Sequence, residues 1–191
     1  QIGQLTTAQV AGLSTTQLSA LTSTQVQQLT TADIKAMSGS QVASGLGTAG
    51  IASLSTNQVQ SLSTSTLNAL SSDQLATLQV SALTTAQVAG LNTTQVSNLG
   101  SSQISNLSSS EVKALGSAQV GAISTSALAG LGSAALQSLT TAQIAGLTND
   151  QLLNGLSTTQ MNELTTQQVN SLTAAQLAGL TSDQLQALNI H

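Results

Sequence analysis

An eight-residue phrase repeats from one end of the chain to the other, and it constrains the fold more than any other feature. Residues 5–13 read LTTAQVAGL, and LSTTQLSAL, LTSTQVQQL and LTTADIKAM follow, each sharing its last residue with the first of the next. Counted from the leading Leu, position 1 is Leu in all but two of the twenty-two octads, and position 6 is always Val, Ile, Leu or Met. Tandem short repeats with regular aliphatic positions predict a solenoid, in which each repeat buries its apolar side chains against its neighbours.

The polar positions of the octad carry two signals for the start of a helix. Position 2 is mostly Ser or Thr, and position 5 is Gln in sixteen of the twenty-two octads. This is the spacing of a capping box, in which each side chain bonds the backbone N–H of the other residue, and positions 1 and 6 have the spacing of a hydrophobic staple. We therefore predict helix caps at the pairs Thr6 and Gln9, Thr84 and Gln87, and Thr140 and Gln143.

Each octad thus predicts a separate helix of about six residues, which is too short to be stable in water alone. We expect an all-α solenoid of short capped helices, one per octad. One continuous helix is disfavoured, because its apolar stripe would turn by about 80° per octad and face no single partner. A β-solenoid is the alternative fold, although positions 1 and 6 would point to opposite sides of an unbroken strand. A coil of two octads and a coil of three octads are both compatible with the sequence.

The same pattern predicts the core and the helix ends. Positions 1 and 6 are expected to be buried between neighbouring helices, and a glycine at position 8 favours a helix that ends on a left-handed residue. The candidate core residues are Leu5, Val10, Leu13, Leu18, Leu91, Val96, Leu99, Ile104, Leu139 and Ile144. The glycines at position 8 include Gly12, Gly90, Gly146 and Gly179.

The octad register slips three times. One residue is added near Gly45, three are missing in residues 78–83, and one is added near Gly155, so the two insertions lie 110 residues apart. We interpret residues 1–191 as one continuous octad-repeat solenoid with a higher-order repeat of 110 residues, in which the two glycines bend or re-register the stack. Because neither end resembles a polar capping repeat, we expect an array that continues or that docks end to end with copies of itself.

The scarcity of charge excludes several partners. Charged residues make up 4% of the chain, the formal net charge is −4, and Lys35 and Lys113 are the only basic side chains besides the single His. A surface that follows nucleic-acid phosphates needs clustered Lys and Arg. No apolar run approaches the roughly 20 residues of a transmembrane helix. We therefore expect no nucleic-acid partner and no membrane span.

No catalytic or metal-binding set can be assembled from the sequence. The chain has no Cys, and its single His is the terminal His191, so neither a Ser-His-Asp nor a Cys-His arrangement is available. Asp33 and Glu111 occupy the capping-box position 5, no octad holds two carboxylates, and no calcium-binding loop pattern is present. We predict that the protein is not an enzyme and uses no cofactor and no metal.

The phrase LTTAQVAGL, with its variants LTTAQIAGL and LTAAQLAGL, resembles the Ser/Thr/Gln-rich repeat regions of very large secreted or surface proteins of Gram-negative bacteria. Some of these are described as adhesins or haemagglutinin-like proteins. The resemblance covers almost the whole chain and implies an extracellular or cell-surface location and a non-enzymatic role, as a surface filament, a biofilm matrix or an adhesin stalk. We therefore predict a structural rod or fibre whose main partner is itself. The alternative is a binding solenoid that offers a Ser/Thr face to carbohydrate, a host surface or ice.

Overall fold

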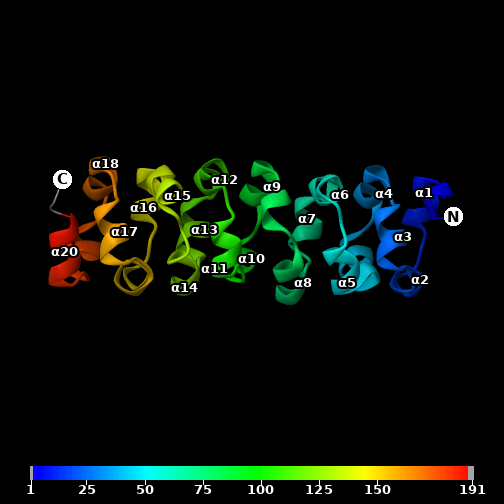
Figure 1. The fold of residues 1–191 in the computed structure, drawn as a ribbon, viewed down its shortest axis with the longest axis horizontal. Coiled ribbons are helices and arrows are strands. Elements are labelled where there is room, and N and C mark those ends of the chain that lie inside the picture. Colours follow the sequence, from blue (N-terminus) through cyan, green and yellow to red (C-terminus); the bar gives the residue numbers. More distant parts are fainter. Residues whose placement is uncertain (1, 189–191) are drawn as a thin grey trace. The chain divides into compact units, whose positions relative to one another are not determined.

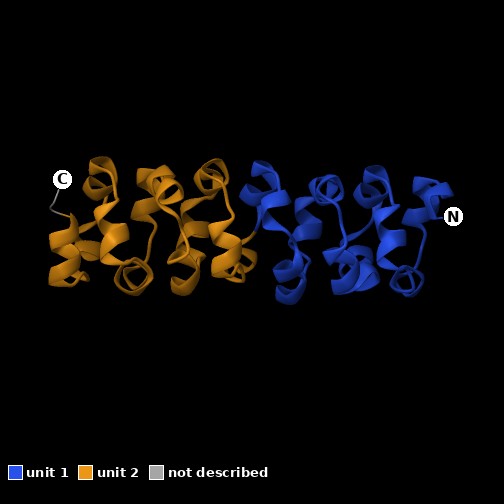
Figure 2. Ribbon diagram, in the orientation of Figure 1, with its two compact units in different colours: residues 1–91 blue, residues 92–191 orange. Residues whose placement is uncertain are grey.

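The structure is a computed structural model that describes residues 2–188, so the terminal His191 lies outside the described residues. It divides the chain into two compact units, residues 1–91 and 92–191 (Figure 2). The described residues form short helices and no strand. The fold is therefore the predicted all-α solenoid of short helices, and the β-solenoid alternative is wrong.

In the first unit nearly every octad forms one helix, and the helices stack side by side (Figure 1). The shortened segment at residues 78–83 forms a tight 3-10 turn in place of an α-helix. The helices are η1 (Ile2–Gln4), α1 (Thr7–Ala11), α2 (Thr15–Ser19), α3 (Ser23–Gln27), α4 (Thr31–Ala36), η2 (Gln41–Leu46), α5 (Gly47–Ala52), α6 (Thr56–Ser61), α7 (Thr64–Leu67), α8 (Ser72–Thr77), η3 (Val80–Ala82) and α9 (Thr85–Gly90).

The second unit repeats the same arrangement. Here too each octad supplies one short helix, separated from the next by two to five residues. The helices are α10 (Thr93–Ser97), α11 (Ser101–Ser105), α12 (Ser109–Ala114), α13 (Ser117–Ala122), α14 (Thr125–Leu128), α15 (Ser133–Ser138), α16 (Thr141–Ala145), η4 (Gln151–Gly155), α17 (Thr158–Asn162), α18 (Thr166–Asn170), α19 (Ala174–Ala178) and α20 (Ser182–Leu188).

Three octads complete one coil. In the first unit α1 packs on α4 and α2 packs on η2, and in the second unit α10 packs on α13, α11 on α14 and α12 on α15. Each helix therefore lies against the helix three octads further along the chain. This geometry decides between the two coil sizes that the sequence left open.

The core lies at positions 1 and 6 between successive coils. Val10, Leu18, Leu91, Val96, Leu99, Ile104, Leu139 and Ile144 are all buried, with at most 4% of each side chain exposed. Leu5 and Leu13 are only partly buried. These two leucines belong to the first coil, and no described coil lies beneath them.

The two inserted residues are accommodated inside helices. Both η2 and η4 are π-helices, whose wider turn holds one extra residue without breaking the chain. A Cβ at Gly45 would lie 3.0 Å from Leu18 Cβ, and a Cβ at Gly155 would lie 3.1 Å from Leu128 Cδ2. The two glycines are 110 positions apart, as are the two leucines. Both insertions are therefore built the same way, with a glycine that lets the wide turn lie close to the preceding coil.

The prediction that position-8 glycines end helices in a left-handed conformation is wrong. Gly12, Gly146 and Gly179 are right-handed, with φ of −85°, −83° and −86°, and Gly90 lies inside α9. The helices close instead through a tight turn, in which the leucine N–H at the next position 1 donates to the position-6 carbonyl. This turn gives the position-6 carbonyl a backbone donor without a left-handed residue.

Some position-8 glycines instead allow neighbouring coils to approach closely. A Cβ at Gly146 would lie 2.8 Å from Ser117 Cβ in the preceding coil. Among residues 2–188 the only positive φ belongs to Gly47, at 64°. That glycine stands at the junction of η2 and α5, where the octad lacks its usual Ser or Thr cap.

Candidate functional site: glutamines that join successive coils

The helix caps form reciprocal pairs at the positions that the sequence indicates. In α16, Gln143 N–H donates to Thr140 Oγ1 at 3.3 Å, and Thr140 N–H donates to Gln143 Oε1 at 2.7 Å. The corresponding distances are 3.3 and 2.8 Å for Thr6 with Gln9. They are 3.2 and 2.9 Å for Thr84 with Gln87. These bonds satisfy the backbone N–H groups at the start of each helix.

The amide nitrogen of the same glutamine reaches into the preceding coil. Gln143 Nε2 donates to the carbonyl oxygen of Val112 at 2.8 Å and to that of Leu115 at 2.6 Å. Only 2% of the Gln143 side chain is exposed. Its oxygen caps one helix while both amide hydrogens bind the preceding coil, so this buried polar group is fully satisfied. We call a position-5 glutamine that makes both kinds of contact a clamp glutamine.

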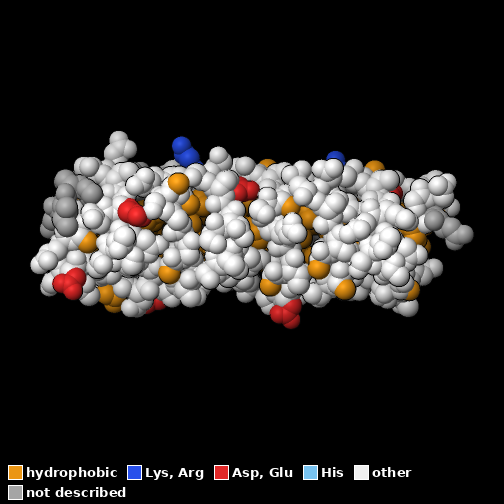
Figure 3. Space-filling model, viewed as in Figure 1, with side chains coloured by type: hydrophobic (Ala, Val, Ile, Leu, Met, Phe, Trp, Pro, Cys, Tyr) orange, Lys and Arg blue, Asp and Glu red, His pale blue; other side chains and the backbone are white. Residues whose placement is uncertain are grey.

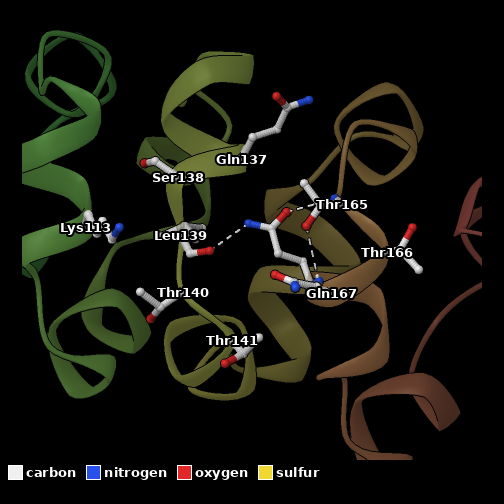
Figure 4. A pocket seen from close by; sticks show the side chains of 10 residues that line it. Lys113, Gln137, Ser138, Leu139, Thr140, Thr141, Thr165, Thr166 and Gln167 are labelled. Atoms are coloured by element: carbon white, nitrogen blue, oxygen red, sulfur yellow. Dashed lines mark hydrogen bonds between the residues drawn. The ribbon is translucent and has the colours of Figure 1, made fainter.

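Clamp glutamines recur in both units. Each donates to the carbonyl that ends one helix, at position 6 or 7, and to the carbonyl of the following position 1. Those that bond both carbonyls in this way are Gln41, Gln58, Gln87, Gln143, Gln151, Gln160, Gln168 and Gln176. Gln184 bonds the two adjacent carbonyls of Leu152 and Leu153, and Gln74 bonds that of Ala43. In Figure 4 the dashed lines join Leu139 to Thr165 through one such side chain, Gln168.

The contact between coils is a feature that the capping-box pattern does not predict. Either Glu or Gln completes a capping box, but only an amide can also donate to carbonyl oxygens. The one signal in the sequence is the strong preference for Gln over Glu at position 5. Asp33 and Glu111 keep only the capping role, in which their carboxylates accept from the N–H groups of Thr30 and Ser108 respectively.

Asp33 shows how an acidic side chain is accommodated at position 5. Burial raises the pKa of Asp33, but hydrogen bonds from the Thr30 hydroxyl, the Thr30 backbone N–H and the Thr7 hydroxyl outweigh burial. The pKa of this carboxyl is therefore held below its ordinary value. Only 3% of the side chain is exposed, so the buried carboxylate depends on these three donors.

An open groove of about 630 Å³ lies on the second unit, between α12, α15, α16 and α18 (Figure 4). Its lining is polar and almost uncharged, because hydroxyl and amide groups predominate and one lysine contributes the only cation. The lining residues are Lys113, Gln137, Ser138, Leu139, Thr140, Thr141, Thr165, Thr166, Gln167 and Gln168. The groove is one of several hollows in the Ser/Thr-rich surface of the second unit.

The remaining surface offers few charged groups. Charged side chains are sparse and separate on the face that Figure 3 shows. Within residues 2–188 no three His, Cys, Asp or Glu side chains are grouped so that they could hold a metal ion. No helix in that range is long and apolar enough to cross a membrane.

The fold and the clamp glutamines define a class, that of helical tandem-repeat proteins. The sequence family described as ALTTAQ repeat matches residues 1–31 and 77–109, together about a third of the chain. Residues 82–87 spell ALTTAQ, and the last of them is the clamp glutamine Gln87. No curated protein and no solved structure matches the chain.

Proposed function

We propose that this protein is a structural element: a helical solenoid that builds a rod or fibre by self-association and has no catalytic role. The proposal places it outside the cell or at the bacterial surface, as a surface filament, a biofilm matrix component or an adhesin stalk. The low charge and the surface rich in hydroxyl and amide groups support this reading. The likeness of its octads to repeats of large secreted proteins supports the location.

The observation that carries the proposal is the clamp glutamine. Where position 5 is a clamp glutamine, one amide uses both of its hydrogens to bind two carbonyl oxygens of the preceding coil. Gln168, for example, binds Leu136 and Leu139 at 2.9 and 2.8 Å. Because this contact recurs along both units, the stack can be extended by a further coil of the same pattern.

Electron microscopy and sedimentation velocity of the purified chain test this proposal. Long, uniform filaments, or a sedimentation coefficient that rises steadily with protein concentration, are the expected results. A chain that stays monomeric at high concentration, with no filaments on the grid, would argue against a self-assembling structural role.

A second candidate function is favoured by the groove between α12, α15, α16 and α18. In this reading the Ser/Thr face binds carbohydrate, a host surface or ice, and Thr141, Thr166 and Gln167 supply exposed hydroxyl and amide groups. Binding to a panel of immobilised glycans, measured for the wild type and for Thr141→Val with Thr166→Val, separates the two functions. Affinity that the double variant loses, in a chain that remains monomeric, would favour the binding role.

A further inference from the structure

Two consecutive octads of the second unit lack the clamp glutamine at position 5. The helices α14 and α15 carry Ala127 and Ala135 there, and these side chains are 0% and 8% exposed. In the octads that follow, α16, η4, α17, α18 and α19 all carry glutamines that bond the preceding coil. The two alanines therefore leave a gap in the hydrogen bonds between coils, at buried sites.

The carbonyls opposite these alanines have no donor. A clamp glutamine such as Gln143 bonds the position-1 carbonyl that lies 28 residues before it. Because the octads of this region are regular, the same spacing places Ala127 opposite the carbonyl of Leu99 and Ala135 opposite that of Leu107. Neither carbonyl accepts a hydrogen bond from any described residue, although the two leucines are only 1% and 5% exposed. We call α14 and α15, together with the turns at Leu99 and Leu107 that they face, the unclamped seam.

The helix starts of the unclamped seam are incomplete as well. Ser124 Oγ accepts from Ala127 N–H at 3.2 Å, but alanine has no side-chain oxygen that could accept in return. The N-cap of α15 is Gly132, which makes no side-chain cap bond. In α16, by contrast, both halves of the capping box are present. The local hydrogen bonds of α14 and α15 are therefore fewer than those of the helices that follow.

Apolar packing holds the unclamped seam closed. Leu128 and Leu136 are both 0% exposed, and α14 and α15 pack on α11 and α12 in the same way that helices pack in the other coils. Described coils lie on both sides of the seam, so the missing donors belong to the interior of the unit. Between coils, the seam differs from the contacts that follow it by the loss of two glutamines and of the two hydrogen bonds that each would make.

We propose that the second unit opens first at the unclamped seam, where two coils separate reversibly while the coils on either side stay folded. The free energy of a local opening depends on the contacts that must be broken, and here the apolar contacts are kept while the hydrogen bonds between coils are missing. In a rod, the seam is a place that bends or yields under load without unfolding the remaining coils. That consequence rests on the proposed function, whereas the opening is a property of a single chain.

Native-state hydrogen exchange of the whole chain tests the proposal, followed by NMR at concentrations where the chain is monomeric. The N–H groups of Leu128, Leu136, Ile144 and Met161 are matched probes, because each donates to the carbonyl of its own N-cap residue at 2.8 to 3.0 Å and each side chain is 0% exposed. We expect Leu128 and Leu136 to exchange at least about 100-fold faster than Ile144 and Met161. Equal rates at the four positions would overturn the proposal.

Restoring the clamps should close the seam. Ala127→Gln with Ala135→Gln supplies both missing amides, and exchange in α14 and α15 should then slow to within about tenfold of that in α16. The matched control, Ser126→Gln with Ala134→Gln, adds the same side chains at exposed positions of the same two helices and should leave the rates unchanged. If the restored variant exchanges no more slowly than the control, the missing glutamines are not the cause and the proposal is wrong.

A converse variant keeps the test decisive if the added glutamines impair folding. Gln143→Ala with Gln151→Ala removes two clamps that bond the preceding coil. Exchange in α16 and η4 should then become as fast as it is in α14 and α15 of the wild type, and unchanged exchange there would overturn the proposal. An absence of filaments in the electron microscope would instead contradict the proposed function, and it would not bear on the seam.

Discussion

Gln143 and Leu115 lie 28 residues apart in different coils, yet the amide nitrogen of Gln143 donates to the carbonyl oxygen of Leu115 at 2.6 Å. The same side chain accepts from Thr140 N–H through its oxygen. One glutamine therefore caps its own helix and also binds the preceding coil through hydrogen bonds. Where position 5 is glutamine, the local folding of the octad and the stacking of the coils depend on the same residue, which accounts for the predominance of Gln at this position.

Removing a cap hydroxyl should destabilise the second unit without altering its fold. Thr140→Ala deletes the acceptor for Gln143 N–H, and loss of such a cap typically costs about 1 kcal/mol. Urea unfolding followed by circular dichroism measures the difference. Thr141→Ala, at the exposed next position, is the control and should stay within about 0.5 kcal/mol of the wild type. Equal losses for the two variants would contradict the capping role.

Val96→Asp should disrupt the stack. Val96 is 0% exposed, so the substitution puts a carboxylate among aliphatic side chains with no partner, at a cost of roughly 3–5 kcal/mol. Thr94→Asp, at an exposed position of the same helix, adds the same charge without burial. Thermal unfolding should show a large fall in midpoint for the first variant and little change for the second. Similar midpoints would count against burial of position 6.

Acid should weaken the first unit through Asp33. Because its folded-state pKa lies below the ordinary value, the carboxylate stabilises the fold above the unfolded pKa of about 3.9, and this stability is lost as the pH falls through the folded-state pKa. Asp33→Asn removes the titrating group. The stability difference between wild type and variant should therefore be larger at pH 6 than at pH 2.5 in urea titrations. A difference independent of pH would show that Asp33 gains nothing from its three donors.

Two glycines at the same octad position should differ in their tolerance of a side chain. A Cβ at Gly146 would meet Ser117 Cβ at 2.8 Å, whereas a Cβ at Gly12 would meet only carbonyls of its own helix, at 3.4 Å and beyond. Both glycines are right-handed. Gly146→Ala should therefore cost roughly 1–3 kcal/mol, and Gly12→Ala should be neutral or slightly stabilising. Calorimetry of both variants distinguishes steric contact between coils from a conformational need for glycine.

The sequence predicts the local structure of each octad but does not predict the contacts between residues that lie far apart along the chain. Helix starts such as Thr140 with Gln143 follow from side-chain chemistry over three residues, so the pattern alone identifies them. The size of the coil cannot be predicted in this way, because it depends on the packing of α10 against α13, and no short-range sequence pattern indicates that contact. The second role of Gln143 was missed for the same reason, since its acceptors lie 28 and 31 residues away.

The error at Gly146 has a related cause. A glycine after a helix usually suggests a left-handed end, but here the close approach of Ser117 explains the missing side chain. The sequence indicates one inserted residue near Gly45 and another near Gly155. That they widen a helix into a π turn, and do not lengthen a loop, could be seen only in three dimensions.

Equilibrium unfolding of Gln143→Glu against Gln17→Glu tests most directly whether position-5 amides hold the coils together. Both substitutions keep an oxygen that can cap the helix. Of these two glutamines, only Gln143 donates to another coil in the described structure. Gln17 is exposed, and its amide has no described acceptor. At concentrations where the chain is monomeric, Gln143→Glu should lose about 3 kcal/mol or more, because two buried carbonyls lose their donor and a charge is buried beside them, and Gln17→Glu should lose less than about 0.5 kcal/mol. Equal stability of the two variants would contradict the account.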